Sequence, residues 1–140
     1  MNEAKKNSYL LLSCTDEWYK QLSPAELQKL IAANRAWVKR LFAEGKARPG
    51  VALERTGATI QGKTKRVVLD GPFAESKEAI GGTLVLDVAT IEEAIAIAKE
   101  CPSLSYSTTT MEVRPISDEC PLEARASELA REKTLAAATV

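Results

Sequence analysis

The chain has 140 residues, a length typical of one domain, and its hydrophobic share of 45% is that of an ordinary globular protein. Lys and Arg number 19 and Asp and Glu also number 19, so the formal net charge is zero and no long-range field attracts nucleic acid or anionic lipid. The chain contains no histidine, which excludes Ser-His-Asp and Cys-His catalytic groups as well as His-ligated zinc and haem.

The first predicted strand covers residues 8–14, SYLLLSC, and we expect it to be buried on both faces because it is almost continuously apolar. Its apolar run is too short for a signal peptide or a membrane span, so we expect a cytoplasmic protein that binds neither membranes nor nucleic acid. Cys14, Cys101 and Cys120 form no C-x-x-C pair, which argues against a zinc site or a disulfide framework. Cys14 is expected to pack in the strand.

A long helix is predicted from the sequence SPAE, in which Ser23 can cap the helix and Glu26 completes a capping box. Gly45 is expected to end this helix. Apolar residues recur between these two points at helical spacing: Leu27, Leu30, Ile31, Trp37, Val38, Leu41 and Phe42. A basic cluster lies near the end of the helix: Lys39, Arg40, Lys46 and Arg48. We interpret it as cations that suit the helix dipole rather than as an RNA-binding patch.

Residues 51–61 and 64–70 are predicted to form a hairpin, and residues 79–88, AIGGTLVLDV, form the next predicted strand. A second helix is expected to open with a capping box of Thr90 and Glu93 and to stop before Pro102. The apolar side of this helix is predicted to consist of Ile91, Ala94, Ile95 and Ala98. Residues 108–116, TTTMEVRPI, form the last predicted strand.

The predicted order β-α-β-β-β-α-β favours an α+β fold of ferredoxin-like type, with both helices on one face of an antiparallel sheet. Residues 117–140 differ, because they have helical propensity but only a thin apolar stripe. We expect a helix over residues 121–134, packed either on the same chain or on a partner chain.

Side chains alternate along strands, which divides the predicted sheet into two faces. The face under the helices is expected to hold Val67, Leu69, Leu84, Leu86, Val88, Met111 and Val113. The second face is expected to hold Arg66, Val68, Asp70, Thr83, Val85, Asp87, Thr110, Glu112 and Arg114. Because this second face mixes apolar and ionisable groups, we predict a homodimer with the two sheets face to face around a polar cavity. The alternative is a solvated face with weak ion pairs.

The stretch LDGPFAESKEAIGG, residues 69–82, joins two of the predicted strands. Asp-Gly-Pro is a turn signal, but Pro72 has no N–H for the Asp70 carboxylate, which is therefore free to face the second side of the sheet. Gly81 and Gly82 weaken a strand unless backbone, ring or ligand approaches closely. The stretch is either a plain connection or the rim of a site.

The sequence DGPFAESKE at 70–78, followed by Gly81, Gly82 and EVRPI at 112–116, resembles the YCII-related family in its DGPF-motif branch. The resemblance covers roughly residues 7–116. It implies a ferredoxin-like domain over residues 1–116 that forms a dimeric α+β barrel, with residues 117–140 as a helical extension. Enzyme-like relatives share a His/Asp pair that this chain lacks. The residues that match the motif are Asp70, Gly71, Pro72, Phe73, Glu75, Lys77, Glu78, Gly81 and Gly82.

The first functional hypothesis is a module that binds a small polar or anionic ligand, or a regulatory module. Arg114 and Arg66 would donate hydrogen bonds to the ligand and Asp70 would orient them. The resemblance adds further candidate ligand-binding residues: Phe73, Glu75, Lys77, Glu78, Gly81 and Gly82.

The alternative is a cofactor-independent enzyme of isomerase or lyase type, in which Asp70 or Glu112 is the general base and Tyr106 the acid. A third reading is an interaction scaffold that uses the C-terminal helix. No Asp/Glu spacing indicates a metal site and no glycine-rich nucleotide motif is present, so no metal and no cofactor are expected.

Overall fold

The computed structural model of the protein describes residues 6–62, 67–71, 79–106 and 109–138. Its strands are β1 (Asn7–Thr15), β2 (Ala47–Ala52), β3 (Gly57–Gln61), β4 (Val67–Gly71), β5 (Ala79–Val88) and β6 (Thr110–Pro115). Its helices are α1 (Pro24–Ala43), α2 (Ile91–Lys99) and α3 (Pro121–Ala138), with short 3-10 turns η1 (Trp18–Gln21) and η2 (Pro102–Ser105).

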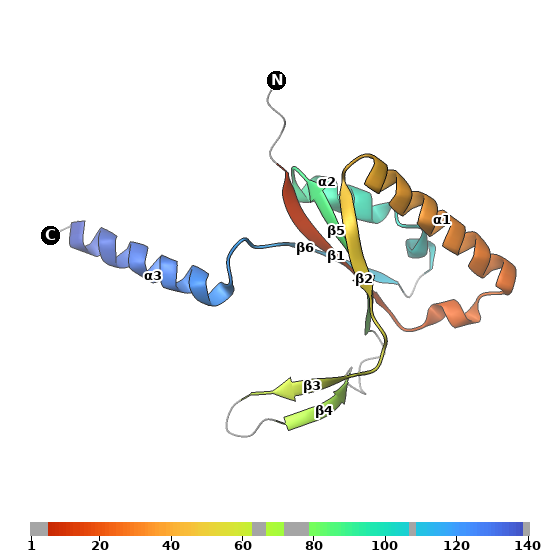
Figure 1. Cartoon of the computed structure of the whole chain (residues 1–140), viewed down its shortest axis with the longest axis horizontal. Helices are drawn as coiled ribbons and strands as arrows, with labels where there is room; N and C mark the ends of the chain where they lie inside the picture. The colour runs from red at the N-terminus through yellow and green to blue at the C-terminus, as the bar shows by residue number, and fades with distance from the viewer. Residues whose placement is uncertain (1–5, 63–66, 72–78, 107–108, 139–140) are drawn as a thin grey trace.

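Four of the strands form one open antiparallel sheet in the order β2-β5-β1-β6. Helices α1 and α2 both lie on one face of this sheet, whereas α3 extends away from it at the end of the chain (Figure 1). The prediction of an α+β fold with an antiparallel sheet is confirmed. Among the described residues, no helix has the length and apolar character that crossing a membrane requires.

The predicted helix boundaries follow from local capping. Ser23 Oγ accepts the Glu26 N–H at 3.2 Å and its hydroxyl donates to Glu26 Oε1 at 3.0 Å. Thr90 Oγ1 accepts the Glu93 N–H at 3.2 Å. Gly45, directly after the C-cap of α1, has φ +68°, which glycine adopts without the strain that a side chain would add. Each cap was predicted from the sequence and is confirmed.

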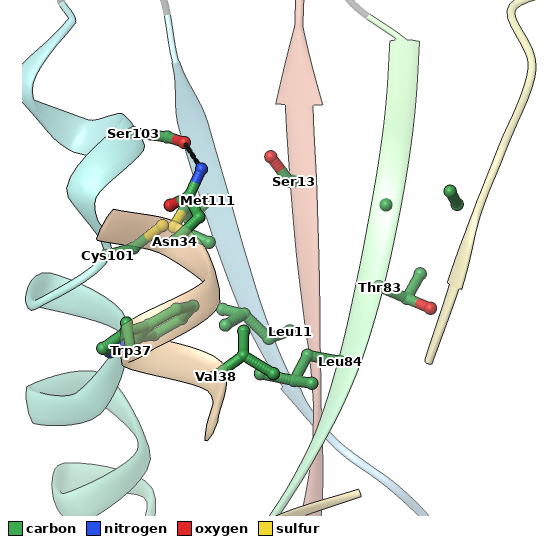
Figure 2. A pocket seen from close by; sticks show the side chains of 12 residues that line it. Leu11, Ser13, Asn34, Trp37, Val38, Thr83, Leu84, Cys101, Ser103 and Met111 are labelled. Carbon is green, nitrogen blue, oxygen red and sulfur yellow. Dashed lines mark hydrogen bonds between the residues drawn. The ribbon is translucent and has the colours of Figure 1, made fainter. Parts of the chain in front are cut away.

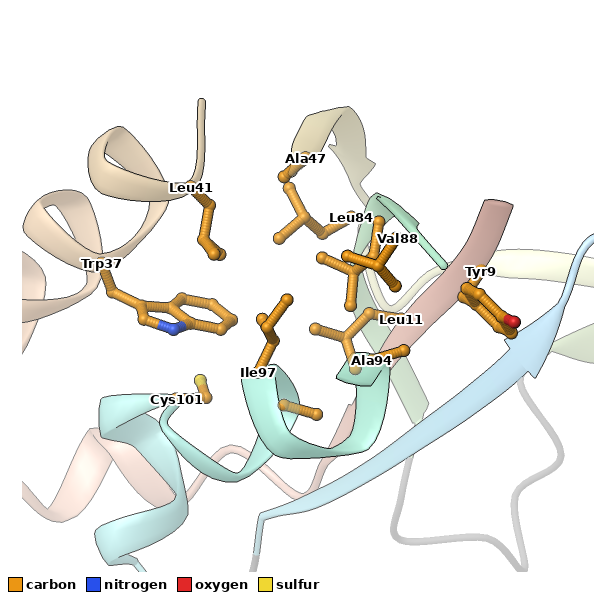
Figure 3. Close-up of a cluster of buried hydrophobic side chains, with 12 residues drawn as sticks. Tyr9, Leu11, Trp37, Leu41, Ala47, Leu84, Val88, Ala94, Ile97 and Cys101 are labelled. Carbon is orange, nitrogen blue, oxygen red and sulfur yellow. The ribbon is translucent and has the colours of Figure 1, made fainter. Parts of the chain in front are cut away.

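The core lies between the sheet and the helices α1 and α2 (Figure 3). Leu84, Leu86 and Val88 of β5 are buried in it, as strand alternation predicts, and Leu86 is 0% exposed. Met111 and Val113 of β6 pack against the same cluster. The other buried core residues are Tyr9, Leu11, Trp37, Leu41, Ala47, Ala94, Ile97, Ala98 and Cys101. The faces of β5 and β6 were therefore assigned correctly.

The predicted hairpin is confirmed where Gly57–Gln61 pairs with Val67–Gly71, but the bounds 51–61 of its first strand are wrong, because the structure divides that segment. Its first residues end β2, which is an edge strand of the main sheet, and Gly57–Gln61 pairs with Val67–Gly71 in a separate two-stranded sheet. Strand β2 was missed because its sequence ARPGVA reads as a polar loop, yet an edge strand tolerates proline and polar side chains.

The separate hairpin also changes the predicted faces. Strand β4 does not belong to the four-stranded sheet, so the assignment of Val67 and Leu69 to a face of that sheet is wrong; their side chains lie outside the described residues. In α2, Ala94 and Ala98 are buried and Ile91 packs against the core, as predicted. Ile95 is wrong, because it is 38% exposed while Ile97, at 7%, is buried instead.

Strands β2 and β5 approach closely beside the site described below. A Cβ on Gly50 would lie 2.1 Å from the Thr83 carbonyl oxygen, so only glycine fits there without a backbone shift. Val51 N–H donates to Thr83 Oγ1 at 2.9 Å, and the Thr83 hydroxyl donates to Val51 O at 3.3 Å. These contacts fix the edge strand against the start of β5.

Candidate ligand-binding site

A cavity of about 470 Å³ lies between α1 and the helix-covered face of the sheet. Figure 2 shows Asn34, Trp37 and Val38 on the α1 side, with Leu11 and Leu84 on the sheet beneath them. The remaining wall consists of Ser13, Ala52, Gly82, Thr83, Cys101, Ser103 and Met111. The wall is mainly apolar and carries a few hydroxyl and amide groups, which is typical of small-molecule sites.

Two polar atoms of this wall are buried without a partner. Asn34 Nδ2 donates to Ser103 Oγ at 3.2 Å, but Asn34 Oδ1 has no hydrogen-bond partner in the part of the chain that the structure describes. The same holds for Nε1 of Trp37, a side chain that is only 8% exposed. A buried polar group without a partner is costly, and such groups gather at functional sites more than elsewhere.

A second cavity of about 350 Å³ adjoins the first. The two have Ser13, Asn34, Gly82 and Ser103 in common, so we treat them as two compartments of one site. The second compartment is lined further by Trp18, Tyr19, Leu27, Leu30, Ile31, Leu53, Arg55 and Gly81. Trp18 Nε1 is again buried without a partner among the described residues.

Arg55, in the wall of this second compartment, belongs to a group of three charged residues. Arg55 Nε donates to Glu17 Oε1 at 2.8 Å, and Lys20 Nζ pairs with Glu17 Oε2. The hydrogen bond from Lys20, together with the charges of Lys20 and Arg55, lowers the pKa of Glu17. Glu17 has φ 69°, a left-handed conformation that is uncommon for a residue with a side chain.

Aromatic packing holds Trp18, the residue after Glu17, in place. Trp18 stacks on Tyr106 with ring centroids 4.5 Å apart and an interplanar angle of 14°. Tyr106, considered from the sequence as an acid, thus packs against the indole of Trp18. The stack joins η1 to the segment after η2, beside the second compartment.

The described walls of the two compartments contain few titratable groups. Burial raises the pKa of the Cys101 thiol, so it stays neutral at physiological pH and is a poor nucleophile. Arg55 is the one ionised side chain among the described residues that line the two compartments. No group of three or more His, Cys, Asp or Glu residues suited to a metal ion occurs in the described ranges.

Two of the residues predicted as a site from the sequence, Glu112 and Arg114, lie away from the cavity. Glu112 and Arg114 project from the uncovered face of β6, with Arg114 Nε 4.0 Å from Glu112 Oε1 and side chains 55% and 69% exposed. Asp70 lies in β4 opposite Ala58, in the separate hairpin, and its side chain is outside the described residues. Their roles as catalytic or binding groups remain predictions.

The rest of the motif divides in two. Gly81 and Gly82 lie in β5, where both line the second compartment and Gly82 also lines the first. Five predicted ligand-binding residues lie outside the described residues: Arg66, Phe73, Glu75, Lys77 and Glu78. Among the predicted site residues whose positions the structure describes, the glycine pair lines the cavity.

The uncovered face has its own polar cluster, which includes Arg48, one of the basic residues noted in the sequence. Arg48 Nε donates to Asp87 Oδ2 at 2.6 Å and Arg48 Nη2 donates to Asp87 Oδ1 at 3.1 Å. The Ser8 hydroxyl donates to Asp87 Oδ1 at 2.7 Å. The hydrogen bonds from Arg48 are the main cause of the lowered pKa of Asp87. The cluster connects three adjacent strands, β2, β5 and β1.

The cavity was not predicted from the sequence. One signal was present: Asn34 follows Leu30 and Ile31 by a helical turn, so an amide occupies the apolar stripe of α1. The other polar contributors, Ser103 and Arg55, come from irregular segments whose positions no periodicity predicts.

Comparison with known proteins places the chain in a family. The model of the YCII-related domain matches residues 8–120, which is most of the chain. An uncharacterized protein of Rhizobium meliloti (strain 1021) is 33% identical over 108 residues, which cover 75% of this chain and 84% of the relative. The chain therefore belongs to the YCII-related family.

Proposed function

We propose that the protein is a small-molecule binding module and that the cavity between α1 and the sheet is its site. The observation that carries this proposal is a cavity of about 470 Å³ whose mainly apolar wall includes four polar residues, Ser13, Asn34, Thr83 and Ser103. Such polar groups would fix the orientation of a bound ligand. The apolar majority of the wall favours a compact, largely apolar body.

The substitution Gly82→Val tests the proposal by filling the cavity. A Cβ at residue 82 has Val51 O as its nearest neighbour at 3.9 Å, which is an ordinary contact, so the strand accommodates it. Residue 82 shares its side of β5 with Leu84, so the valine side chain enters the cavity. The matched control is Gly57→Val in β3, where a Cβ meets nothing within 4 Å.

A metabolite library screened by thermal shift is the measurement. We expect compounds that raise the unfolding temperature of the wild-type protein and of Gly57→Val, but not that of Gly82→Val. A compound that stabilises all three proteins equally binds elsewhere. If every stabilising compound behaves so, or none is found, the proposed site is wrong.

We further propose the finer classification that the sequence suggested, namely the DGPF-motif branch and a ferredoxin-like dimeric barrel. The sheet order β2-β5-β1-β6 supports the ferredoxin-like topology, since each helix connects two strands that are not adjacent. The half-buried Leu10 and Val85 on the uncovered face support a homodimer through that face.

Sedimentation of the purified chain tests the dimer. Val85→Lys, which adds a charge to the uncovered face, is expected to convert the dimer to a monomer. Leu122→Lys on α3, a side chain that is 82% exposed, is the control and is expected to leave the dimer intact. A monomeric wild-type chain contradicts the proposal, and dissociation by Leu122→Lys alone points to α3 as the interface.

A further inference from the structure

The two compartments differ in charge. The described wall of the larger one contains no ionised side chain, and that of the smaller one contains Arg55. Arg55 lies after β2 and its side chain is 31% exposed, so its guanidinium reaches both the compartment and solvent. An apolar cavity whose described wall contains one partly exposed cation matches a molecule with an apolar body and one negative charge.

Arg55 shares its carboxylate partner with a second cation. Glu17 binds Arg55 through Oε1 and Lys20 through Oε2. If Arg55 binds another anion, Glu17 therefore stays paired with Lys20. Lys20 is also the larger cause of the lowered pKa of Glu17. The Glu17 carboxylate thus occupies a position that an external carboxylate would take, and on displacement from Arg55 it keeps its pairing with Lys20.

We propose that the cavity binds an amphipathic monocarboxylate, with its carboxylate on Arg55 in place of Glu17 and its apolar body against Trp37 and Leu84. The inference rests on the proposed function and adds the ligand class. Arginine is suited to this role because its planar fork of N–H donors matches a carboxylate. The stacked indole of Trp18 adds apolar surface to the compartment that Arg55 lines.

The probes are 4-phenylbutyrate and its neutral counterpart 4-phenylbutan-1-ol, which differ in the carboxylate alone. The readout is intrinsic fluorescence, because the chain has two tryptophans and each lines one compartment. We expect the acid to bind about tenfold more tightly than the alcohol, as one hydrogen bond to a charged group provides. This preference should decrease as the salt concentration rises.

Two variants should shift the affinity for the acid in opposite directions. Arg55→Gln is expected to abolish the tenfold preference, while Glu17→Gln removes the competing carboxylate and should tighten binding of the acid several-fold. Affinity for the alcohol should not change in either variant. Arg48→Gln is the matched control, since Arg48 is also paired with a carboxylate but lies on the uncovered face.

The outcomes separate this inference from the proposed function. If acid and alcohol bind equally and Arg55→Gln changes neither, the assignment of Arg55 is overturned while the cavity remains the site. If neither probe binds, the ligand class is wrong, and the library screen with Gly82→Val still decides the function. Urea denaturation of each variant, and the midpoint of its unfolding transition, shows whether the variant is folded.

Discussion

The two faces of the four-stranded sheet are built from the same strands but in opposite ways. On the covered face, Leu11 and Leu86 are 2% and 0% exposed and the helices close over them. On the uncovered face, β1 and β5 present Leu12, which is 8% exposed, and the half-buried Leu10 and Val85 beside the Ser8–Asp87–Arg48 cluster. Burial of apolar area thus stabilises the covered face most, and hydrogen bonds between strands add to a smaller buried area on the other. The covered face also contains the cavity.

The largest difference between the faces should appear when a leucine is truncated on each. Leu86→Ala is expected to lower the free energy of unfolding by about 3 kcal/mol, because it leaves a void in a filled core. Leu10→Ala, on the half-buried side of β1, should lower it by about 1 kcal/mol. Urea denaturation followed by tryptophan fluorescence measures both values. Equal losses would contradict the division of the sheet into a core face and an uncovered face.

Much of this division could be predicted from the sequence, since β5 alternates apolar and polar residues and buries Leu84, Leu86 and Val88. Helix ends followed from Ser23 and Thr90, whose caps depend only on neighbouring residues. Local patterns contain such information because the partner groups are three residues away.

The remaining features depend on contacts between distant segments. Strand β2 is held by Arg48 to Asp87, which is 39 residues away, and its own sequence has no strand period. The cavity needs Asn34 and Ser103, 69 residues apart, to meet. No motif in either segment predicts the other, which is why the glycine pair alone linked the sequence-based site to the observed one.

A smaller effect is expected from Asp87 on the uncovered face. Asp87→Asn should lower the free energy of unfolding by about 1 kcal/mol at pH 7, because it replaces the charged acceptor of the Arg48 and Ser8 hydrogen bonds, on a side chain that is 20% exposed. The variant keeps the shape of the side chain, so the loss reports on charge.

The pH dependence of this loss has a definite sign. The pKa of Asp87 is lowered in the folded protein, mainly by the hydrogen bonds from Arg48, so its stabilisation is complete above the ordinary aspartate pKa of about 4. It decreases as the pH falls below that value and is lost once the pH passes below the folded pKa. The difference between wild type and variant in urea denaturation at pH 7, 5, 4 and 3 should therefore shrink. A difference that is constant with pH would mean that the ion pair is not its source.

The smallest effect is expected for Arg114, which the sequence had suggested as a ligand-binding residue. Its side chain is 69% exposed and its nearest carboxylate, on Glu112, is 4.0 Å away. Exposed pairs of this kind contribute little, so Arg114→Ala should change the free energy of unfolding by less than about 0.5 kcal/mol. The measurement is the same urea titration, with Arg48→Ala as the control whose bidentate contact predicts a larger loss. A loss above about 1 kcal/mol for Arg114→Ala that grows with protein concentration would instead show that Arg114 itself lies inside the proposed homodimer interface, because stability then depends on association.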